Sequence, residues 1–146
     1  IKVPRPRLLM LLGLTPFLIG FVLNAAFLTV LQAHFQLLSA VLLGLWGYLS
    51  YRLRNPQDSA LKNAMLLQVP AFAVLLLVIY QAYLRGEFWP NAFGRLTQFY
   101  YLPVIPLAAQ IARLFFDAVG SWQLYTLGFA LMFVASLVGG AMSRDV

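Results

Sequence analysis

The stretch that decides the fold is LLMLLGLTPFLIGFVLNAAFLTVLQAHFQLLSAVLLGLWGYLSY, residues 8–51, which contains no Lys, Arg, Asp or Glu. Its 44 residues would form an α-helix about 66 Å long, roughly twice the ~30 Å hydrocarbon core of a bilayer. An uncharged run of this length is therefore expected to cross a membrane, turn, and cross back. The polar residues at 32–36 (QAHFQ) mark the expected turn.

Further uncharged runs follow, so we predict an all-α, polytopic integral membrane protein that forms one domain over residues 1–146. A bundle of five transmembrane segments is expected at about 8–31, 37–51, 64–84, 96–116 and 119–142. Trp46, Tyr48 and Tyr51 are expected to form an aromatic belt at the end of the second segment.

The fourth segment has an alternative interpretation. Pro103 and Pro106 each remove a backbone donor and kink a helix, so residues 96–116 could instead form a re-entrant or interfacial helix beside four spans. We favour five crossings, because Phe99, Tyr100 and Tyr101 at one end and Arg113 near the other resemble interface anchors.

The composition agrees with a membrane location. Hydrophobic residues make up 62% of the chain and charged residues 10%, against roughly 25% charged in soluble proteins. The chain has no Cys, which excludes thiolate zinc sites, iron–sulfur clusters and thiol–disulfide exchange. We predict no cofactor and no metal site.

The net charge of +6 arises from basic residues that flank the apolar runs. They are expected to act as topology signals and lipid contacts rather than in nucleic-acid binding. Six of them would share one face: Lys2, Arg5, Arg7, Arg52, Arg54 and Lys62. We expect this face, with the N-terminus, on the cytoplasmic side of a bacterial-type membrane. The rule that basic residues gather on the cytoplasmic side places 7 of them there and 3 on the other side, whether or not segment 96–116 crosses. The rule therefore does not decide the side of the C-terminus.

Small residues suggest two packing surfaces. Gly13, Pro16, Gly20 and Asn24 recur at helical spacing in the first segment, and such a notched face lets another helix approach closely. Asn24 could add a hydrogen bond across this face. In the last segment Gly139 and Gly140 belong to a similar stripe and are also expected to mediate helix packing.

The candidate ligand-binding residues lie in the predicted outer half of the bilayer. Asn24, Gln81 and Gln98 could form a polar vestibule together with Ser39 and Thr97. Pro103 and Pro106 would leave carbonyls near Phe99 and Leu102 without intrahelical donors, and a ligand or a neighbouring side chain could satisfy them. Gln68 is a further candidate, because Pro70 also frees a carbonyl.

Few residues suggest catalysis. Arg113 and Asp117 are four residues apart and form a candidate charged pair if one helix continues through both. His34 is the only histidine and falls in the expected turn, where an interfacial polar role is favoured. No serine lies in a Gly-x-Ser-x-Gly motif, and no catalytic residue is assigned.

The leading functional hypothesis is therefore a non-enzymatic membrane protein, either an accessory or structural subunit of a larger complex or a small transport module. Its expected partners are membrane lipids and another membrane protein or a second copy of the chain, with no nucleic acid. One alternative is a small-solute or lipid carrier that uses the outer polar residues. The other is an interfacial lipid-modifying enzyme that uses Arg113 with Asp117, or Arg52 with Arg54, on a phosphate headgroup.

Overall fold

The computed structural model describes residues 5–26, 35–55 and 57–142. Most of the expected turn at 32–36, including His34, lies outside these residues, as do Lys2 and Arg144. Every regular element in the described part is helical, which confirms the all-α prediction. The elements are α1 (Arg5–Leu12), α2 (Thr15–Ala26), α3 (Phe35–Leu53), α4 (Ala60–Ile79), the π-helical turn η2 (Tyr80–Leu84), α5 (Ala92–Tyr101), α6 (Ile105–Phe115) and α7 (Ser121–Met142).

Three helical stretches among the described residues are long and apolar enough to span a membrane: Pro6–Asn24, Ala60–Leu84 and Ser121–Met142. The predicted count of five segments is not confirmed. The helix α3 has 19 residues, but Gln36, Ser39 and Arg52 make it less apolar than the other three. The fourth predicted segment is divided into two short helices, α5 and α6.

The first segment is also interrupted, between α1 and α2. Pro16 has no N–H to donate to the carbonyl of Leu12, and it disfavours helical backbone at the residue before it. The Thr15 hydroxyl donates to that carbonyl instead, at 2.8 Å. The interruption is therefore satisfied locally and leaves the Gly13 carbonyl free to accept from another helix.

The helix α4 begins at a capped turn. The Ser59 side chain accepts from the backbone N–H of Lys62 at 3.1 Å, which satisfies one of the free donors at the helix start. The Lys62 ammonium group lies 2.6 Å from a carboxylate oxygen of Asp58. This hydrogen bond is the main reason why the pKa of Asp58 lies below its ordinary value of 3.8.

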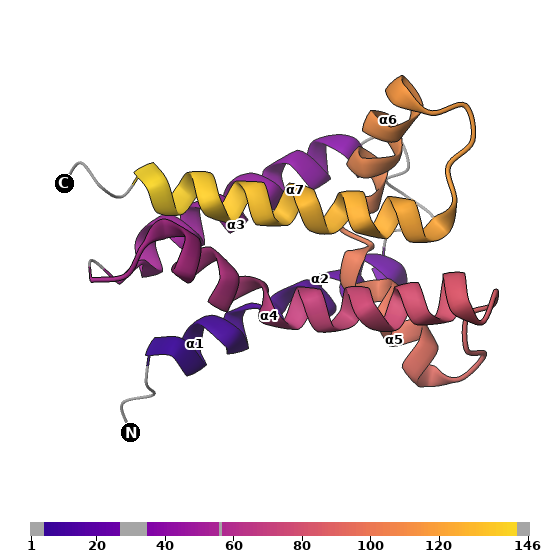
Figure 1. The fold of residues 1–146 in the computed structure, drawn as a ribbon, viewed down its shortest axis with the longest axis horizontal. Coiled ribbons are helices and arrows are strands. Elements are labelled where there is room, and N and C mark those ends of the chain that lie inside the picture. Colours follow the sequence, from indigo (N-terminus) through magenta and orange to yellow (C-terminus); the bar gives the residue numbers. More distant parts are fainter. Residues whose placement is uncertain (1–4, 27–34, 56, 143–146) are drawn as a thin grey trace.

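The helices α4 and α7 run along the long axis of the molecule, and the described chain begins and ends near the same end (Figure 1). At the opposite end the rings of Tyr83 and Trp122 meet edge to face, with centroids 5.6 Å apart. The last turn of α4–η2 therefore lies beside the first turn of α7. The segment that contains α5 and α6 therefore begins and ends at this same end of the bundle.

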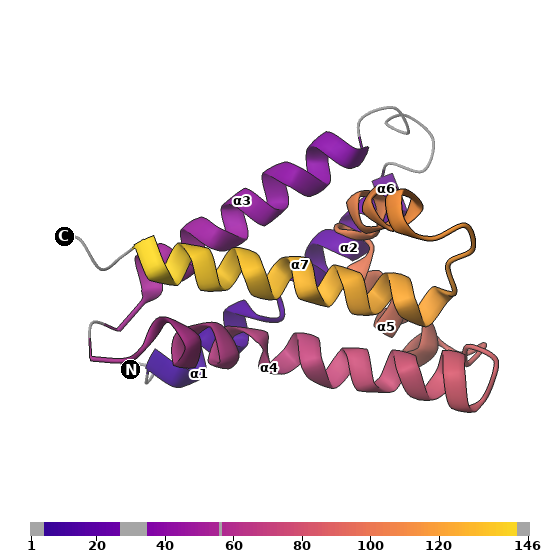
Figure 2. The same ribbon diagram turned by 45° about the horizontal axis from the view of Figure 1, so that its top comes forward.

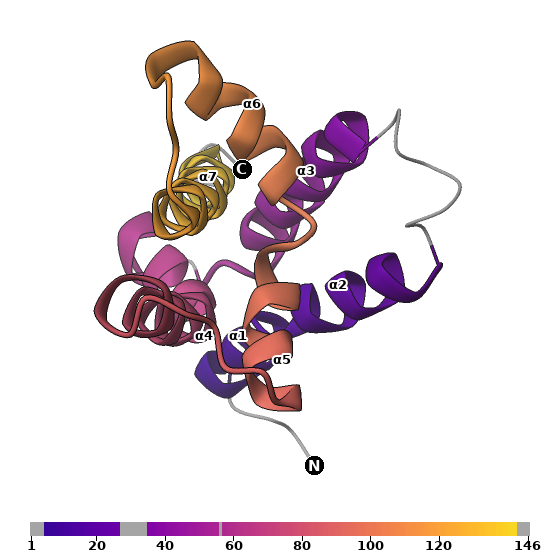
Figure 3. The ribbon, with the colours of Figure 1, turned by 90° about the vertical axis from the view of Figure 1, so that its right-hand side faces the viewer.

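The helices α5 and α6 lie across the bundle rather than along it (Figure 3). The helix α5 packs against α2 and α4, whereas α6 packs against α3 and α7. The structure therefore has two short helices across the bundle where the sequence favours one transmembrane segment over 96–116. The physical reason is the break at residues 102–104, where Pro103 ends one helix and Pro106 occupies the first turn of the next.

Some of the aromatic residues predicted at the membrane interface lie in the core instead. Tyr100, Tyr101 and Trp46 are buried, whereas Tyr48 of the predicted belt is exposed. Each phenol donates to a backbone carbonyl of another segment, both at 2.5 Å: Tyr100 to Gly13, at the break between α1 and α2, and Tyr101 to Ala71 within α4. A buried phenol is stable when its hydroxyl finds such a partner.

The helices α3 and α7 converge toward their C-terminal ends (Figure 2). At this crossing Gly139 lies directly against the Gly47 carbonyl, where a Cβ atom would clash with the backbone. Close approach is possible because both helices carry glycine there. The crossing, together with the packing of α4 on α7, makes α7 the central helix of the bundle.

Candidate functional site

The break between α5 and α6 forms the centre of the candidate site. Pro103 cannot donate to the carbonyl of Phe99, which accepts from the backbone N–H of Leu102 at 3.2 Å instead. The Pro103 carbonyl accepts from the Ser39 hydroxyl of α3 at 2.7 Å. Ser39 therefore supplies a side-chain donor at the break, although to the Pro103 carbonyl and not to the carbonyls of Phe99 and Leu102, which were expected to need one.

The first segment is fitted to this break by a small residue. Gly20 is buried, and its Cα faces the Phe99 carbonyl so closely that no side chain could stand there. Gly13 lies in the same way against Leu67 and Pro70 of α4. The notched face of the first segment thus contacts two different helices, α5 and α4. Asn24 lies one turn further along this face and is half-buried.

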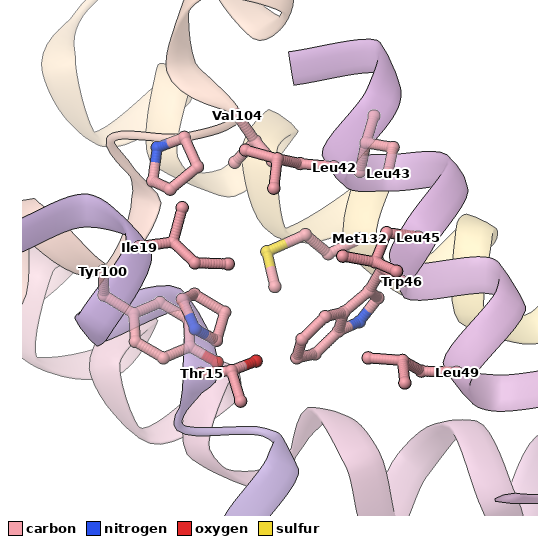
Figure 4. A pocket seen from close by; sticks show the side chains of 12 residues that line it. Thr15, Ile19, Leu42, Leu43, Leu45, Trp46, Leu49, Tyr100, Val104 and Met132 are labelled. Carbon is pink, nitrogen blue, oxygen red and sulfur yellow. The ribbon is translucent and has the colours of Figure 1, made fainter. Parts of the chain in front are cut away.

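A cavity of about 40 Å³ lies beside the break (Figure 4). Thr15 and Ile19 of α2 line one side, and Trp46 of α3 lies opposite them, with Met132 of α7 between (Figure 4). The remaining lining residues are Pro16, Leu42, Leu43, Leu45, Leu49, Tyr100, Pro103 and Val104. The Thr15 and Tyr100 hydroxyls donate to backbone carbonyls. The Trp46 Nε1 donor is buried without a partner among the described residues, but one donor is fewer than the two to four polar partners that a buried water needs, so the lining favours a small apolar occupant.

A polar cluster holds α3, α4 and α7 together. Gln68 of α4 donates through Nε2 to the Met132 carbonyl at 3.1 Å and to the Ser136 hydroxyl oxygen at 2.7 Å. Ser50 of α3 donates to the Ser136 carbonyl at 2.6 Å. Asn63 of α4 reaches the Ser50 carbonyl at 3.4 Å. We call Ser50, Asn63, Gln68 and Ser136 the polar cluster; all four are buried.

Gln81 performs a similar role at the other end. Its side chain is buried, accepts from the Trp89 backbone N–H at 3.0 Å and donates to the Thr97 hydroxyl oxygen at 3.2 Å. It therefore fixes the loop that connects η2 to α5. Gln98, which is half-buried, donates to the Gly94 carbonyl of its own helix at 3.3 Å.

The predicted vestibule residues are thus divided among several places. Pro103 lines the cavity beside the break, and Pro106 lies half-buried in the first turn of α6. Asn24, Gln81 and Gln98 do not line this cavity. The structure brings Gln81 and Thr97 together by a hydrogen bond at the end of the bundle that carries the loop before α5.

Arg113 and Asp117 are both exposed. The helix α6 ends at Phe115, so the helical spacing that would pair these two side chains is not formed. The ion pairs within the described residues join Lys62 to Asp58 and Arg85 to Glu87. The same residues contain no group of three or more His, Cys, Asp and Glu side chains that could hold a metal ion.

The glycines of the last helix also make close contacts. Gly139 lies against α3, as described above, and Gly140 is buried beside Ala60 at the start of α4. The Gly140 carbonyl accepts from the Arg54 guanidinium group at 2.7 Å. A cation at this position is favourable, because the C-terminal end of α7 carries partial negative charge.

The partners within the polar cluster are not evident from the sequence. Gln68 is a candidate there because of Pro70, but its amide reaches α7. A glutamine and two serines within apolar helices are a usable signal, because each needs a partner inside a membrane. The signal does not reveal which helix supplies that partner.

Comparisons of the chain with protein-family models, with curated proteins and with solved structures found no match. The fold and the site define the chain at the level of class: a helical protein in which three stretches of the described residues are apolar and long enough to span a membrane.

Proposed function

We propose that the chain is a non-enzymatic integral membrane protein that acts as a structural or accessory subunit of a larger membrane complex. The observation that carries this proposal is the use of the buried polar side chains. In the described residues, Ser39, Ser50, Gln68, Tyr100 and Tyr101 each donate to a carbonyl on another element. Polar groups used in this way hold helices together and favour a scaffold over a reaction centre.

The proposal includes a topology of four crossings and one re-entrant element. The crossings are α1–α2, α3, α4–η2 and α7, and α5–α6 enters and leaves on one side. The contact between Tyr83 and Trp122 supports this arrangement. It gives a cytoplasmic face with the N-terminus, the loop at 52–62 and the C-terminus, and an opposite face with Arg85, Arg95 and Arg113.

Re-entrant backbone is tolerated at membrane depth only where protein surrounds it. The helices α2 and α4 flank α5, and α3 and α7 flank α6, which meets this requirement. The Ser39 bond to Pro103 supplies a donor at the break itself.

Purification of the tagged chain from its native membrane in mild detergent tests the subunit proposal. We expect a second membrane protein to elute with it at a fixed molar ratio that does not change with the expression level of the tagged chain. A chain that elutes alone as a monomer, with the helical content and unfolding temperature it has in native lipid, would contradict the proposal.

A second candidate function is favoured by the cavity beside the break. A site of about 40 Å³ lined by apolar side chains suits a small apolar solute, as a carrier would require. Xenon under pressure is a suitable probe, and the Met132 methyl group, which lines the cavity, is a suitable NMR reporter. We expect its signal to shift with xenon pressure in the wild type.

Ile19→Phe places a larger side chain at the cavity and should abolish this shift. Val22→Phe is the matched control, because Val22 lies on the same helix but is exposed. A Met132 methyl signal that does not shift with xenon pressure in the wild type would contradict the carrier function.

A further inference from the structure

A groove of about 600 Å³ runs between α3 and α7 on the outside of the bundle. It lies toward the C-terminal ends of both helices, where Gly47 and Gly139 bring them close. The lining residues are Leu43, Gly44, Gly47, Tyr48, Tyr51, Ala135, Val138, Gly139 and Met142. Its volume falls within the range of about 300–1,000 Å³ that is typical of ligand pockets.

Gly44 keeps the groove open. No heavy atom lies within 4 Å of the position that a Cβ atom of Gly44 would occupy, in contrast to Gly20 or Gly139. This glycine is therefore not required for packing inside the chain. The side chains of Val138 and Met142 are exposed beside it, at 52% and 66% of their surface. In a bilayer such an apolar groove faces lipid.

One end of the groove is polar and basic. The rings of Tyr48 and Tyr51 stack there with centroids 6.4 Å apart. Arg52 follows directly in the last turn of α3, is exposed, and lies on the Tyr48 side of the helix, four residues further on. Among the described residues Arg52 has no carboxylate within ion-pair distance.

A second cation, Arg54, adds positive charge at this end of the groove. Arg54 donates to the carbonyls of Gly140 and Asp58, at 2.7 and 3.2 Å, and these contacts leave its positive charge without a carboxylate partner in the described part of the chain. The Asp58 carboxylate is engaged by Lys62 and Asn55. Positive charge therefore accumulates where the apolar groove meets the expected headgroup region.

We propose that this groove binds one anionic phospholipid, with an acyl chain between α3 and α7 and the phosphate on Arg52 beside the Tyr48 and Tyr51 phenols. Guanidinium groups bind phosphate well, and tyrosines are enriched at headgroup level. The inference rests on the proposed membrane location but not on the proposed subunit role.

A second copy of the chain fits the groove less well than a lipid. Copies in one membrane that pair through this face about an axis normal to the bilayer would form an isologous contact, in which each residue near the axis meets its own counterpart. The two Arg52 side chains would then approach each other without a counter-charge. A phosphate removes this repulsion, so charge complementarity selects the anionic lipid.

Native mass spectrometry of the purified chain tests the proposal, with phosphatidylglycerol and phosphatidylcholine supplied at equal concentration in mixed micelles. We expect one phosphatidylglycerol adduct per chain and fewer phosphatidylcholine adducts. Arg52→Gln should weaken the phosphatidylglycerol adduct about fivefold, the effect of one basic residue at a membrane surface. Arg95→Gln, which removes an exposed cation at the other end, should leave the adduct unchanged.

Gly44→Phe fills the groove and should also remove the adduct, whereas Ala73→Phe at an exposed position of α4 should not. Equal binding of the two lipids, or an adduct that survives Gly44→Phe, would overturn the proposal. A wild-type dimer that Gly44→Phe converts to a monomer would assign the groove to a second copy instead. The measurement uses the isolated chain, so absence of a partner subunit would not affect it.

Discussion

The ring of Tyr83, in the last turn before the 85–91 loop, lies edge to face against the ring of Trp122, in the first turn of α7, with centroids 5.6 Å apart. This contact joins the two ends of the segment that contains α5 and α6. A segment whose ends lie together cannot run the length of the bundle. The contact therefore supports the proposed re-entrant element over a fifth crossing.

Cysteines at these two positions should cross-link. Tyr83→Cys with Trp122→Cys is expected to be cross-linked in the membrane by a short bifunctional thiol reagent, which bridges the space that the two contacting rings occupy. Tyr83→Cys with Met142→Cys is the control, since these residues lie at opposite ends of the antiparallel α4–η2 and α7 (Figure 1). The chain has no native Cys, so the reagent cannot join any other pair within it. Cross-linking of the control pair and not the test pair would refute the arrangement.

Gly20→Leu should destabilise the protein strongly. The new side chain would enter the space of the Phe99 carbonyl, and overpacking of this kind costs about 1–3 kcal/mol or more. Leu18→Ala, at a side chain 70% exposed on the same helix, should change stability by less than about 0.5 kcal/mol. Unfolding of both variants in a denaturing detergent titration measures the difference, and equal stabilities would contradict the packing described here.

The polar cluster should show coupling between α4 and α7. Gln68→Met and Ser136→Ala each remove the Gln68–Ser136 hydrogen bond, and a double-mutant cycle isolates its contribution. We expect a coupling free energy of about 0.6 kcal/mol, the average that such cycles give for interhelical hydrogen bonds in membranes, and no more than about 1.7 kcal/mol. Ser39→Ala combined with Gln68→Met is the control and should be additive. A coupling of zero for the test pair would mean that the bond adds nothing to stability.

The ion pair at the start of α4 should depend on pH in a defined direction. Lys62 lowers the pKa of Asp58 below 3.8, so the pair's contribution is fully present above that value and is lost as the pH falls through the lower pKa of the folded state. Lys62→Met should raise the pKa of Asp58. The carboxyl carbon shift of Asp58 across a pH titration measures this, and an unchanged midpoint would contradict it.

The helical segments can be predicted from the sequence, and so can the break within the fourth predicted segment. Pro103 and Pro106 predict a break by local chemistry, because neither can donate a backbone hydrogen bond. Whether the chain crosses or turns back after the break depends on contacts far along the sequence, such as Tyr83 with Trp122. Local patterns do not encode those contacts.

The buried phenols illustrate the same limit. Tyr100 and Tyr101 suit a membrane interface and a core with a free carbonyl equally well, because each has an apolar ring and one polar group. The carbonyls of Gly13 and Ala71 decide between the two, and they lie on other helices. In the same way, Gln68 could be predicted to need a partner, but Ser136 could not be predicted to be that partner.

Single cysteines at Gln57, Asn91 and Ala118 test the central claim, the four-crossing topology with a re-entrant α5–α6, most directly. Each is labelled in intact cells or oriented vesicles with a thiol reagent that does not cross the membrane. We predict that Gln57→Cys is labelled from one side, and that Asn91→Cys and Ala118→Cys are both labelled from the other. Labelling of Ala118→Cys from the same side as Gln57→Cys would contradict the claim and would favour five crossings.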